Sequence, residues 1–160
     1  MNEIEIYHGS GEIVTNPEIR QTRYAKDFSW GFYCTKSFDQ AHRWALRRHE
    51  SGIISVYSYT ENESLNILRF PQMSDPWLDF IAESRAGKTH SYDIVEGPMA
   101  DDEVWNYVND FLSGYISRAL FWEYAKFKHP THQISFHTEQ ALLCISFKRS
   151  AGVNDESENR

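Results

Sequence analysis

The residues best suited to ligand binding stand near the start of the chain, in the segment Tyr7-His8-Gly9-Ser10. A histidine ring can donate or accept a hydrogen bond, and a neighbouring glycine leaves backbone N–H and C=O groups open to a ligand. On this segment alone two interpretations stay open: a binding site, and a turn in which the histidine has no ligand.

A second candidate is the aromatic segment Asp-Phe-Ser-Trp-Gly-Phe-Tyr-Cys-Thr at residues 27–35. Residues 31–35 are predicted to form a strand, and alternation then places Phe32 and Tyr33 on opposite faces. One ring can enter the core while the other faces a cleft. Trp44 follows nine residues after the segment. Aromatic packing and ligand stacking are both compatible with this pattern.

Three basic residues at three-residue spacing, Arg20, Arg23 and Lys26, lie in the loop between these two segments. An arginine guanidinium can bind phosphate through two parallel hydrogen bonds. The alternative is a solvated basic loop face.

Together, Tyr-His-Gly-Ser, the Gly-Phe-Tyr-x-Thr strand and a following helix with an aromatic near its middle resemble the diphtheria-toxin-like and poly(ADP-ribose)-polymerase-like ADP-ribosyltransferases. Four motifs in the same order resemble, more closely, an uncharacterised bacterial branch of that superfamily. The motifs are Tyr-His-Gly-Ser, Arg-x-x-x-Asp-Phe-x-x-Gly-Phe-Tyr-x-Thr, Tyr-Asp-Ile-Val leading to Ala-Asp-Asp, and Gln-Ile-Ser-Phe-x-Thr. They occupy residues 7–10, 23–35, 92–102 and 133–138. The resemblance therefore covers nearly the whole chain except its C-terminal end.

The resemblance implies NAD as the bound cofactor and substrate, and it implies a role for each motif residue. His8 would hydrogen-bond the adenosine ribose, and the Gly9 backbone would hold the nicotinamide carboxamide. Tyr33 would stack on the nicotinamide ring, Trp44 would close its other side, and Arg23 would bind the pyrophosphate. The predicted cofactor-binding set is Tyr7, His8, Gly9, Ser10, Arg23, Tyr33 and Trp44.

One position departs from the better-known family pattern. Where well-studied relatives begin a strand with a glutamate that binds the nicotinamide ribose, this chain has Gln133. Glutamine can accept the hydroxyl hydrogen bond but carries no charge to stabilise a developing cation. Either Gln133 suffices or a nearby acid contributes. Glu139 is the first choice, although an acid in the first turn of a helix is also favoured by the helix dipole. Tyr33, Gln133 and Glu139 form the predicted catalytic set, and the further candidate acids are Glu96, Asp101 and Asp102.

The other chemistry-bearing residues are assigned structural roles. His129, His132 and His137 are close in sequence, but strand alternation and Pro130 separate them, so no metal site is predicted. The two cysteines, Cys34 and Cys144, lie in hydrophobic strand patterns typical of buried structural thiols.

Short strands and helices in irregular alternation must position these residues, which favours an α+β fold with an antiparallel or mixed sheet. Helix starts are predicted at the capping residues Ser37, Ser74, Asp101 and Thr138. Strands are predicted near residues 4–7, 31–35, 53–60, 65–70, 92–96, 133–137 and 144–147, with 65–70 as the partner of 53–60. The resemblance implies the split sheet of ADP-ribosyltransferases with flanking helices.

Composition and net charge exclude several classes of protein. The chain has 160 residues and a net charge of −7, which argues against broad non-specific adhesion to nucleic acid. No apolar run approaches the roughly 18 residues of a membrane span. The acidic first residues do not resemble a signal peptide, so a cytosolic protein is expected.

Residues 1–149 are predicted to form one domain and residues 150–160 a disordered polar tail. The aromatic share is 15%, which allows a stacking ligand.

The leading functional expectation is an NAD-dependent mono-ADP-ribosyltransferase that modifies a protein or nucleic acid. The resemblance and the small size suggest a bacterial toxin of a toxin–antitoxin or phage-defence system, with an antitoxin protein as a partner. Two alternatives remain: a catalytically inactive module that binds NAD, ADP-ribose or a protein, and an NAD glycohydrolase that uses water as the acceptor.

Overall fold

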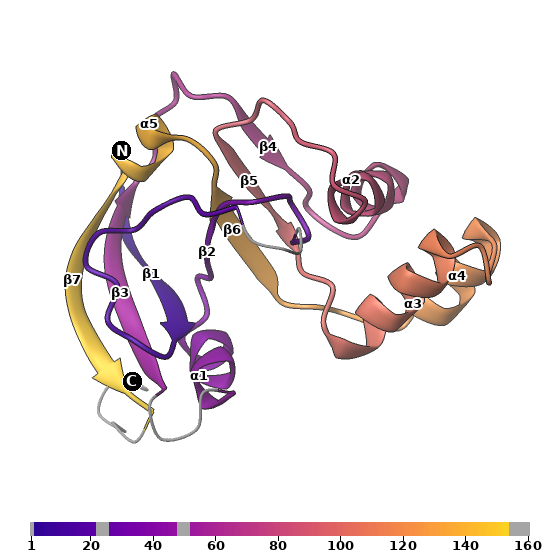
Figure 1. The fold of residues 1–160 in the computed structure, drawn as a ribbon, viewed down its shortest axis with the longest axis horizontal. Helices are drawn as coiled ribbons and strands as arrows, with labels where there is room; N and C mark the ends of the chain where they lie inside the picture. The colour runs from indigo at the N-terminus through magenta and orange to yellow at the C-terminus, as the bar shows by residue number, and fades with distance from the viewer. Residues whose placement is uncertain (1, 22–25, 48–51, 154–160) are drawn as a thin grey trace.

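Two β-sheets and five helices make up the protein in the computed structural model, which describes residues 2–21, 26–47 and 52–153 (Figure 1). The α+β class predicted from the sequence is confirmed, with one antiparallel and one mixed sheet.

The antiparallel sheet has the order β1-β3-β7. Its strands are β1 (Glu3–Ser10), β3 (Ile53–Thr60) and β7 (Ile145–Gly152). The β1 strand passes through the whole Tyr7-His8-Gly9-Ser10 segment, because these residues pair with residues 53–56 of β3. The prediction that this strand stops before His8 is therefore wrong. The β7 strand extends to residue 152 by pairing with the start of β3, so residues 150–152 are strand rather than tail. Residues 154–160 lie outside the described part of the chain.

The mixed sheet has the order β2-β6-β5-β4. Its strands are β2 (Phe32–Cys34), β6 (His132–Phe136), β5 (Ile94–Pro98) and β4 (Ile67–Arg69). The β4 strand runs parallel to β5, and the other pairs are antiparallel. The prediction that residues 65–70 pair with 53–60 is wrong, because β3 has β1 and β7 on its two edges.

Each helix begins at a side-chain cap. The helices are α1 (Phe38–Leu46), α2 (Asp75–Arg85), α3 (Asp102–Leu112), α4 (Arg118–Ala125) and α5 (Glu139–Leu142). The predicted caps Ser37, Ser74, Asp101 and Thr138 each accept a hydrogen bond from a backbone N–H in the first turn. The four predicted helix starts are confirmed.

Three hydrophobic clusters hold these elements together. One lies between the two sheets and includes Phe32 and Phe136. A second packs the mixed sheet against α2, α3 and α4 around Tyr33 and Trp77. The third seats α1 on the antiparallel sheet. Phe32 and Tyr33 therefore enter different clusters, as strand alternation predicts.

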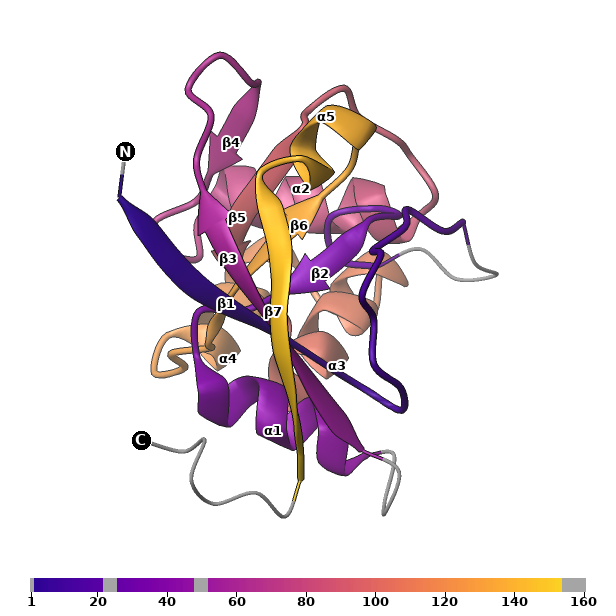
Figure 2. The same cartoon turned by 90° about the vertical axis from the view of Figure 1, so that its left-hand side faces the viewer.

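The two sheets meet where β1 passes β2. The backbone N–H of Tyr7 donates to the Thr35 carbonyl at 2.8 Å, and the Thr35 N–H donates back to the Tyr7 carbonyl at 2.9 Å. Figure 1 shows β2 next to β1, and Figure 2 shows α1 across the end of the antiparallel sheet. This seam brings the first two sequence motifs together.

A helix able to span a membrane is not found in the described ranges 2–21, 26–47 and 52–153.

Candidate functional site

A cavity of about 520 Å³ opens at the seam between the two sheets. Five residues of the predicted binding and catalytic sets line it: His8, Gly9, Tyr33, Trp44 and Gln133. They come from β1, β2, α1 and β6, so both sheets contribute. Its other lining residues are Lys26, Asp27, Arg47, Arg85, Met99 and Ala100. The charged side chains among these described lining residues are the cations Lys26, Arg47 and Arg85 and the buried carboxylate of Asp27.

Gly9 is required by the close approach of helix α1 to strand β1. A Cβ atom at Gly9 would lie 2.2 Å from the Ala41 carbonyl oxygen and 2.9 Å from the Ala45 nitrogen. Such contacts are impossible without separating helix from strand. The glycine therefore lets α1 pack directly on β1 and brings Trp44 to the cavity wall.

The His8 ring is fixed by contacts to β2. Its Nδ1 lies 2.7 Å from the Tyr33 carbonyl oxygen, and its ring stacks on Phe32 with centroids 4.4 Å apart. A carbonyl accepts but never donates, so Nδ1 carries the proton in this bond. In a neutral ring with this tautomer, Nε2 is a hydrogen-bond acceptor.

Tyr33 has its hydroxyl anchored in the protein while its ring contributes to the cavity wall. The hydroxyl accepts from the Phe28 N–H at 2.9 Å and donates to the Ser29 carbonyl at 2.5 Å. Burial raises the pKa of Tyr33 well above its usual value, so the phenol stays protonated and does not serve as a base. The Lys26 ammonium lies 5.1 Å from the ring centroid, which is a cation–π contact. The ring thus already accepts a cation on its face.

Gln133 lies in a buried network that the sequence analysis did not predict. Its Nε2 donates to Asp27 Oδ2 at 3.1 Å, and the Ala100 N–H donates to the same oxygen at 2.8 Å. The other carboxylate oxygen, Oδ1, accepts from Arg85 Nε at 2.8 Å and also from Nη2. The Arg85 guanidinium in turn stacks on the Trp105 ring, 3.7 Å from its centroid.

Asp27 is the acid that the structure places beside Gln133. It belongs to the Asp-Phe-x-x-Gly-Phe-Tyr motif, so a signal for it was present in the sequence. Its separation of 106 residues from Gln133 gave no indication that the two side chains meet.

Glu139 is not brought to this cavity. It lies in the exposed first turn of α5, beyond the opposite end of β6 from Gln133. Glu96 instead forms ion pairs with Lys36 and Arg69. The Asp101 carboxylate caps α3. Asp102 begins α3, and its side chain is not described.

The remaining predicted ligand-binding residues lie around the first cavity or outside the described residues. Ser10 lines an adjoining cavity of about 710 Å³, which shares His8, Lys26 and Tyr33 with the first. Arg20 also lines this second cavity. The Tyr7 ring packs edge-on against Phe38 of α1, with centroids 5.4 Å apart, and is not among the residues that line either cavity. Arg23 lies outside the described residues.

His137 forms a partly buried pair with His90 rather than with the neighbouring histidines of the sequence. The two rings have centroids 4.4 Å apart. His137 Nδ1 donates to the Trp30 carbonyl at 2.8 Å, and Nε2 lies 2.7 Å from the Ser135 hydroxyl. Burial lowers the pKa of His137 to about 4. A group of three or more side chains able to hold a metal ion is not found in the part of the chain that the structure describes.

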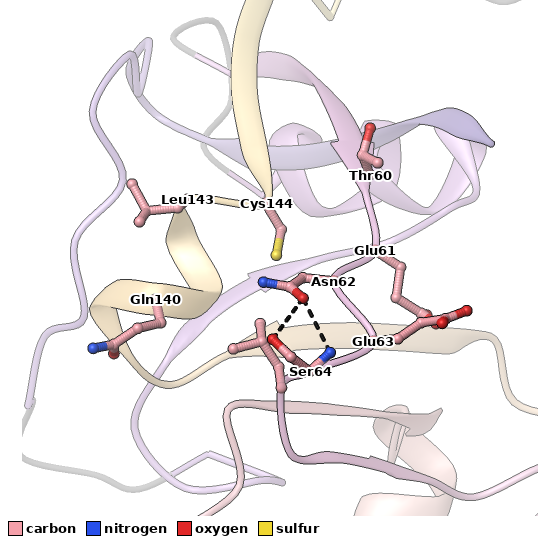
Figure 3. Close-up of a pocket in the computed structure, with 9 residues that line it drawn as sticks. Thr60, Glu61, Asn62, Glu63, Ser64, Gln140, Leu143 and Cys144 are labelled. Carbon is pink, nitrogen blue, oxygen red and sulfur yellow. Dashed lines mark hydrogen bonds between the residues drawn. The ribbon is translucent and has the colours of Figure 1, made fainter. Parts of the chain in front are cut away.

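A separate hollow of about 620 Å³ lies between the β3–β4 connection and α5 (Figure 3). Asn62 Oδ1 organises this connection by accepting hydrogen bonds from the backbone N–H and the hydroxyl of Ser64. Cys144 lies at the back of the hollow, where burial raises the pKa of its thiol. The unreactive thiol form is therefore favoured, although Cys144 is half-buried and not the buried thiol that its strand pattern predicts.

Comparison with known proteins places almost the whole chain in one family. A family model described as a protein of unknown function (DUF3990) matches residues 4–147. Neither the curated proteins nor the solved structures contain a match.

Proposed function

The chain belongs to the DUF3990 family, and we propose that it is an NAD-dependent mono-ADP-ribosyltransferase with an ADP-ribosyltransferase-like fold. The observation that carries this proposal is that five residues of the predicted binding and catalytic sets, from four separate elements, line one cavity. The sequence resemblance independently implies roles in NAD binding or catalysis for His8, Gly9, Tyr33, Trp44 and Gln133.

The chemistry of the cavity suits the oxidised nicotinamide ring. A pyridinium is flat and cationic, and the Tyr33 ring face already attracts the Lys26 ammonium. We infer that the nicotinamide ring takes this place and that Lys26 moves toward a phosphate of the ligand. The adjoining cavity has room for the rest of the dinucleotide, with Ser10, Arg20 and His8 on its walls.

In the proposed reaction the C1′–N bond between ribose and nicotinamide breaks, and its electron pair returns to the ring nitrogen. The pyridinium thereby becomes neutral nicotinamide. An acceptor nucleophile forms the new bond to C1′ and releases its proton. Stacking by Tyr33 and Trp44 would hold the leaving ring, while Gln133 accepts a hydrogen bond from a ribose hydroxyl. Fixed acceptors near the sugar stabilise the oxocarbenium-like transition state.

The second candidate is a module that binds NAD or ADP-ribose without turnover. It is favoured by the charges behind Gln133: Asp27 is paired with Arg85, so the network brings no net negative charge to the ribose. The acceptor, the toxin role and the antitoxin partner remain predictions from the resemblance.

The test is incubation of the purified protein with NAD labelled in its adenylate part, together with a cell lysate. Transfer of label to macromolecules and release of nicotinamide support the transferase. Free ADP-ribose without labelled macromolecules identifies a glycohydrolase, and NAD binding in calorimetry without turnover identifies the binding module. Failure to bind or consume NAD refutes the proposal.

Trp44→Ala is the most informative variant, because this side chain is half-buried and its loss should leave the fold intact. We expect a loss of nicotinamide release of about fivefold or more, since removing one stacked ring costs on the order of 1 kcal/mol or more. Tyr115→Ala is the matched control, because Tyr115 is 81% exposed and is not among the residues lining the two adjoining cavities.

A further inference from the structure

We propose that Asp27 is a positioning residue that fixes the Gln133 side-chain amide with its oxygen toward the cavity. The site would then select a ligand that presents a hydroxyl group to this oxygen. This inference rests on the proposed function for the identity of that ligand, namely the nicotinamide ribose of NAD.

The orientation of the amide follows from the chemistry of its partner. A carboxylate only accepts hydrogen bonds, so the Gln133 group that faces Asp27 Oδ2 at 3.1 Å must be the NH₂. The amide oxygen Oε1 then points to the other side. Gln133 Oε1 receives no hydrogen bond from the described residues. In these residues Tyr59 Oη is the side-chain polar atom that is both fully enclosed and without a partner. Gln133 Oε1 is therefore not fully enclosed, and it is reachable from the cavity that Gln133 lines.

Asp27 can impose this orientation because it is itself held on all sides. Its side chain is almost fully buried and receives hydrogen bonds from the Ala100 N–H and the Arg85 guanidinium. The stack of Arg85 on Trp105 fixes the guanidinium plane. A carboxylate with these partners cannot turn away without leaving a buried N–H and a cation unpaired, which is costly.

A fixed acceptor at this point predicts selectivity for a hydroxyl. A site built to hydrogen-bond a substrate hydroxyl rejects the analogue that lacks it, because its own polar group is then left unpaired. NAD with the 2′-hydroxyl of the nicotinamide ribose should therefore be preferred to its 2′-deoxy analogue. Were Gln133 free to rotate, its NH₂ would face the cavity part of the time and this preference would weaken.

The experiment compares two double variants that both remove the buried ion pair. Asp27→Asn with Arg85→Gln keeps an oxygen that can accept from Gln133 and Ala100, whereas Asp27→Leu with Arg85→Met leaves no acceptor. Replacing both members of a buried ion pair is tolerated far better than removing one. Thermal unfolding followed by circular dichroism checks that both variants fold.

The measured quantity is the ratio of kcat/KM for NAD to kcat/KM for 2′-deoxy-NAD. The intrinsic difference in reactivity between the two compounds cancels when this ratio is compared between proteins. Both variants lower turnover, because Arg85 lines the cavity. We expect the Asn/Gln variant to keep the ratio within about threefold of the wild type, and the Leu/Met variant to lower it by at least about tenfold. Equal ratios in the two variants overturn the inference.

A second measurement separates this inference from the proposed function. Nuclear magnetic resonance of the Gln133 side-chain NH₂, assigned by comparison with Gln133→Met, needs no ligand. The wild-type and Asn/Gln proteins should show slowly exchanging amide protons, and exchange in the Leu/Met protein should be at least about tenfold faster. Uniform exchange in all three overturns the positioning role. A wild-type protein with protected protons and no NAD chemistry refutes the proposed function alone.

Discussion

His137 should make the protein sensitive to mild acid. Its ring is enclosed by Trp30, Ser135, His90 and the edge of Tyr33, and burial lowers its pKa from the usual 6.5 to about 4. The pKa of His90 is lowered as well, also by burial. Both rings are neutral in the folded protein at neutral pH. They protonate more readily in the unfolded chain.

The sign and size of the effect follow from the two pKa values of His137. A histidine whose pKa is depressed by folding contributes stability above its unfolded pKa, and this contribution is lost as the pH falls. Between pH 7 and pH 4, with values of 6.5 unfolded and about 4 folded, the free energy of unfolding should fall by about 3 kcal/mol from this group. His90 acts in the same direction. That loss is a large part of the 5–15 kcal/mol typical of a domain.

The assay is urea unfolding at pH values from 7 to 4, with His137→Asn as the variant. Asparagine can still donate to the Trp30 carbonyl but does not titrate. The variant should be less stable than the wild type at pH 7, because it leaves a cavity, and its free energy of unfolding should decline less steeply with acid. His129→Asn is the control, since His129 is exposed. Parallel pH curves for wild type and His137→Asn would refute the reasoning.

Further variants test the packing of the site. Gly9→Ala should lower the free energy of unfolding by more than about 2 kcal/mol, because the new Cβ meets the Ala41 carbonyl at 2.2 Å. Gly114→Ala, with a φ of +79° but open space around it, should cost about 1–2 kcal/mol; equal losses in urea unfolding would contradict the steric argument. Tyr33→Phe should cost about 1–3 kcal/mol, because the buried Phe28 N–H loses its acceptor, yet NAD binding in calorimetry should remain. A loss of binding in a folded Tyr33→Phe protein would show that the hydroxyl, rather than the ring, is needed. Cys34 is fully buried and should react with thiol reagents at the rate of unfolding, so rapid labelling in native buffer would contradict its position.

The elements that local chemistry determines were predictable from the sequence. The four helix caps are examples, because a serine, threonine or aspartate side chain accepts from a backbone N–H only two or three residues ahead. The strand at 53–60 also matches its predicted range, since its pattern spans eight residues. Strand partners are different. Residues 65–70 follow 53–60 closely, yet β4 joins β5 in the other sheet, a choice set by long-range packing.

The sequence motifs identify several residues of the candidate site but do not show which side chains meet in space. His8, Gly9, Tyr33 and Trp44 line one cavity, whereas Tyr7 packs against Phe38 of α1. The acid beside Gln133 was not identified, because candidates were sought near it in sequence. Glu139 is six residues away along the chain, but β6 carries it to the far end of the sheet. Asp27 is 106 residues away and lies within hydrogen-bond distance.

Under the proposed function, the position of Asp27 also explains how a glutamine can stand where the better-known ADP-ribosyltransferases have a glutamate. A glutamate at 133 would put two carboxylates about 3 Å apart in a buried site, and such a pair retains a shared proton rather than two charges. Glutamine avoids this repulsion by donating to Asp27 and still offers an acceptor oxygen to the cavity. Gln133 and Asp27 are therefore best understood as one unit, in which the choice of residue at either position depends on the other.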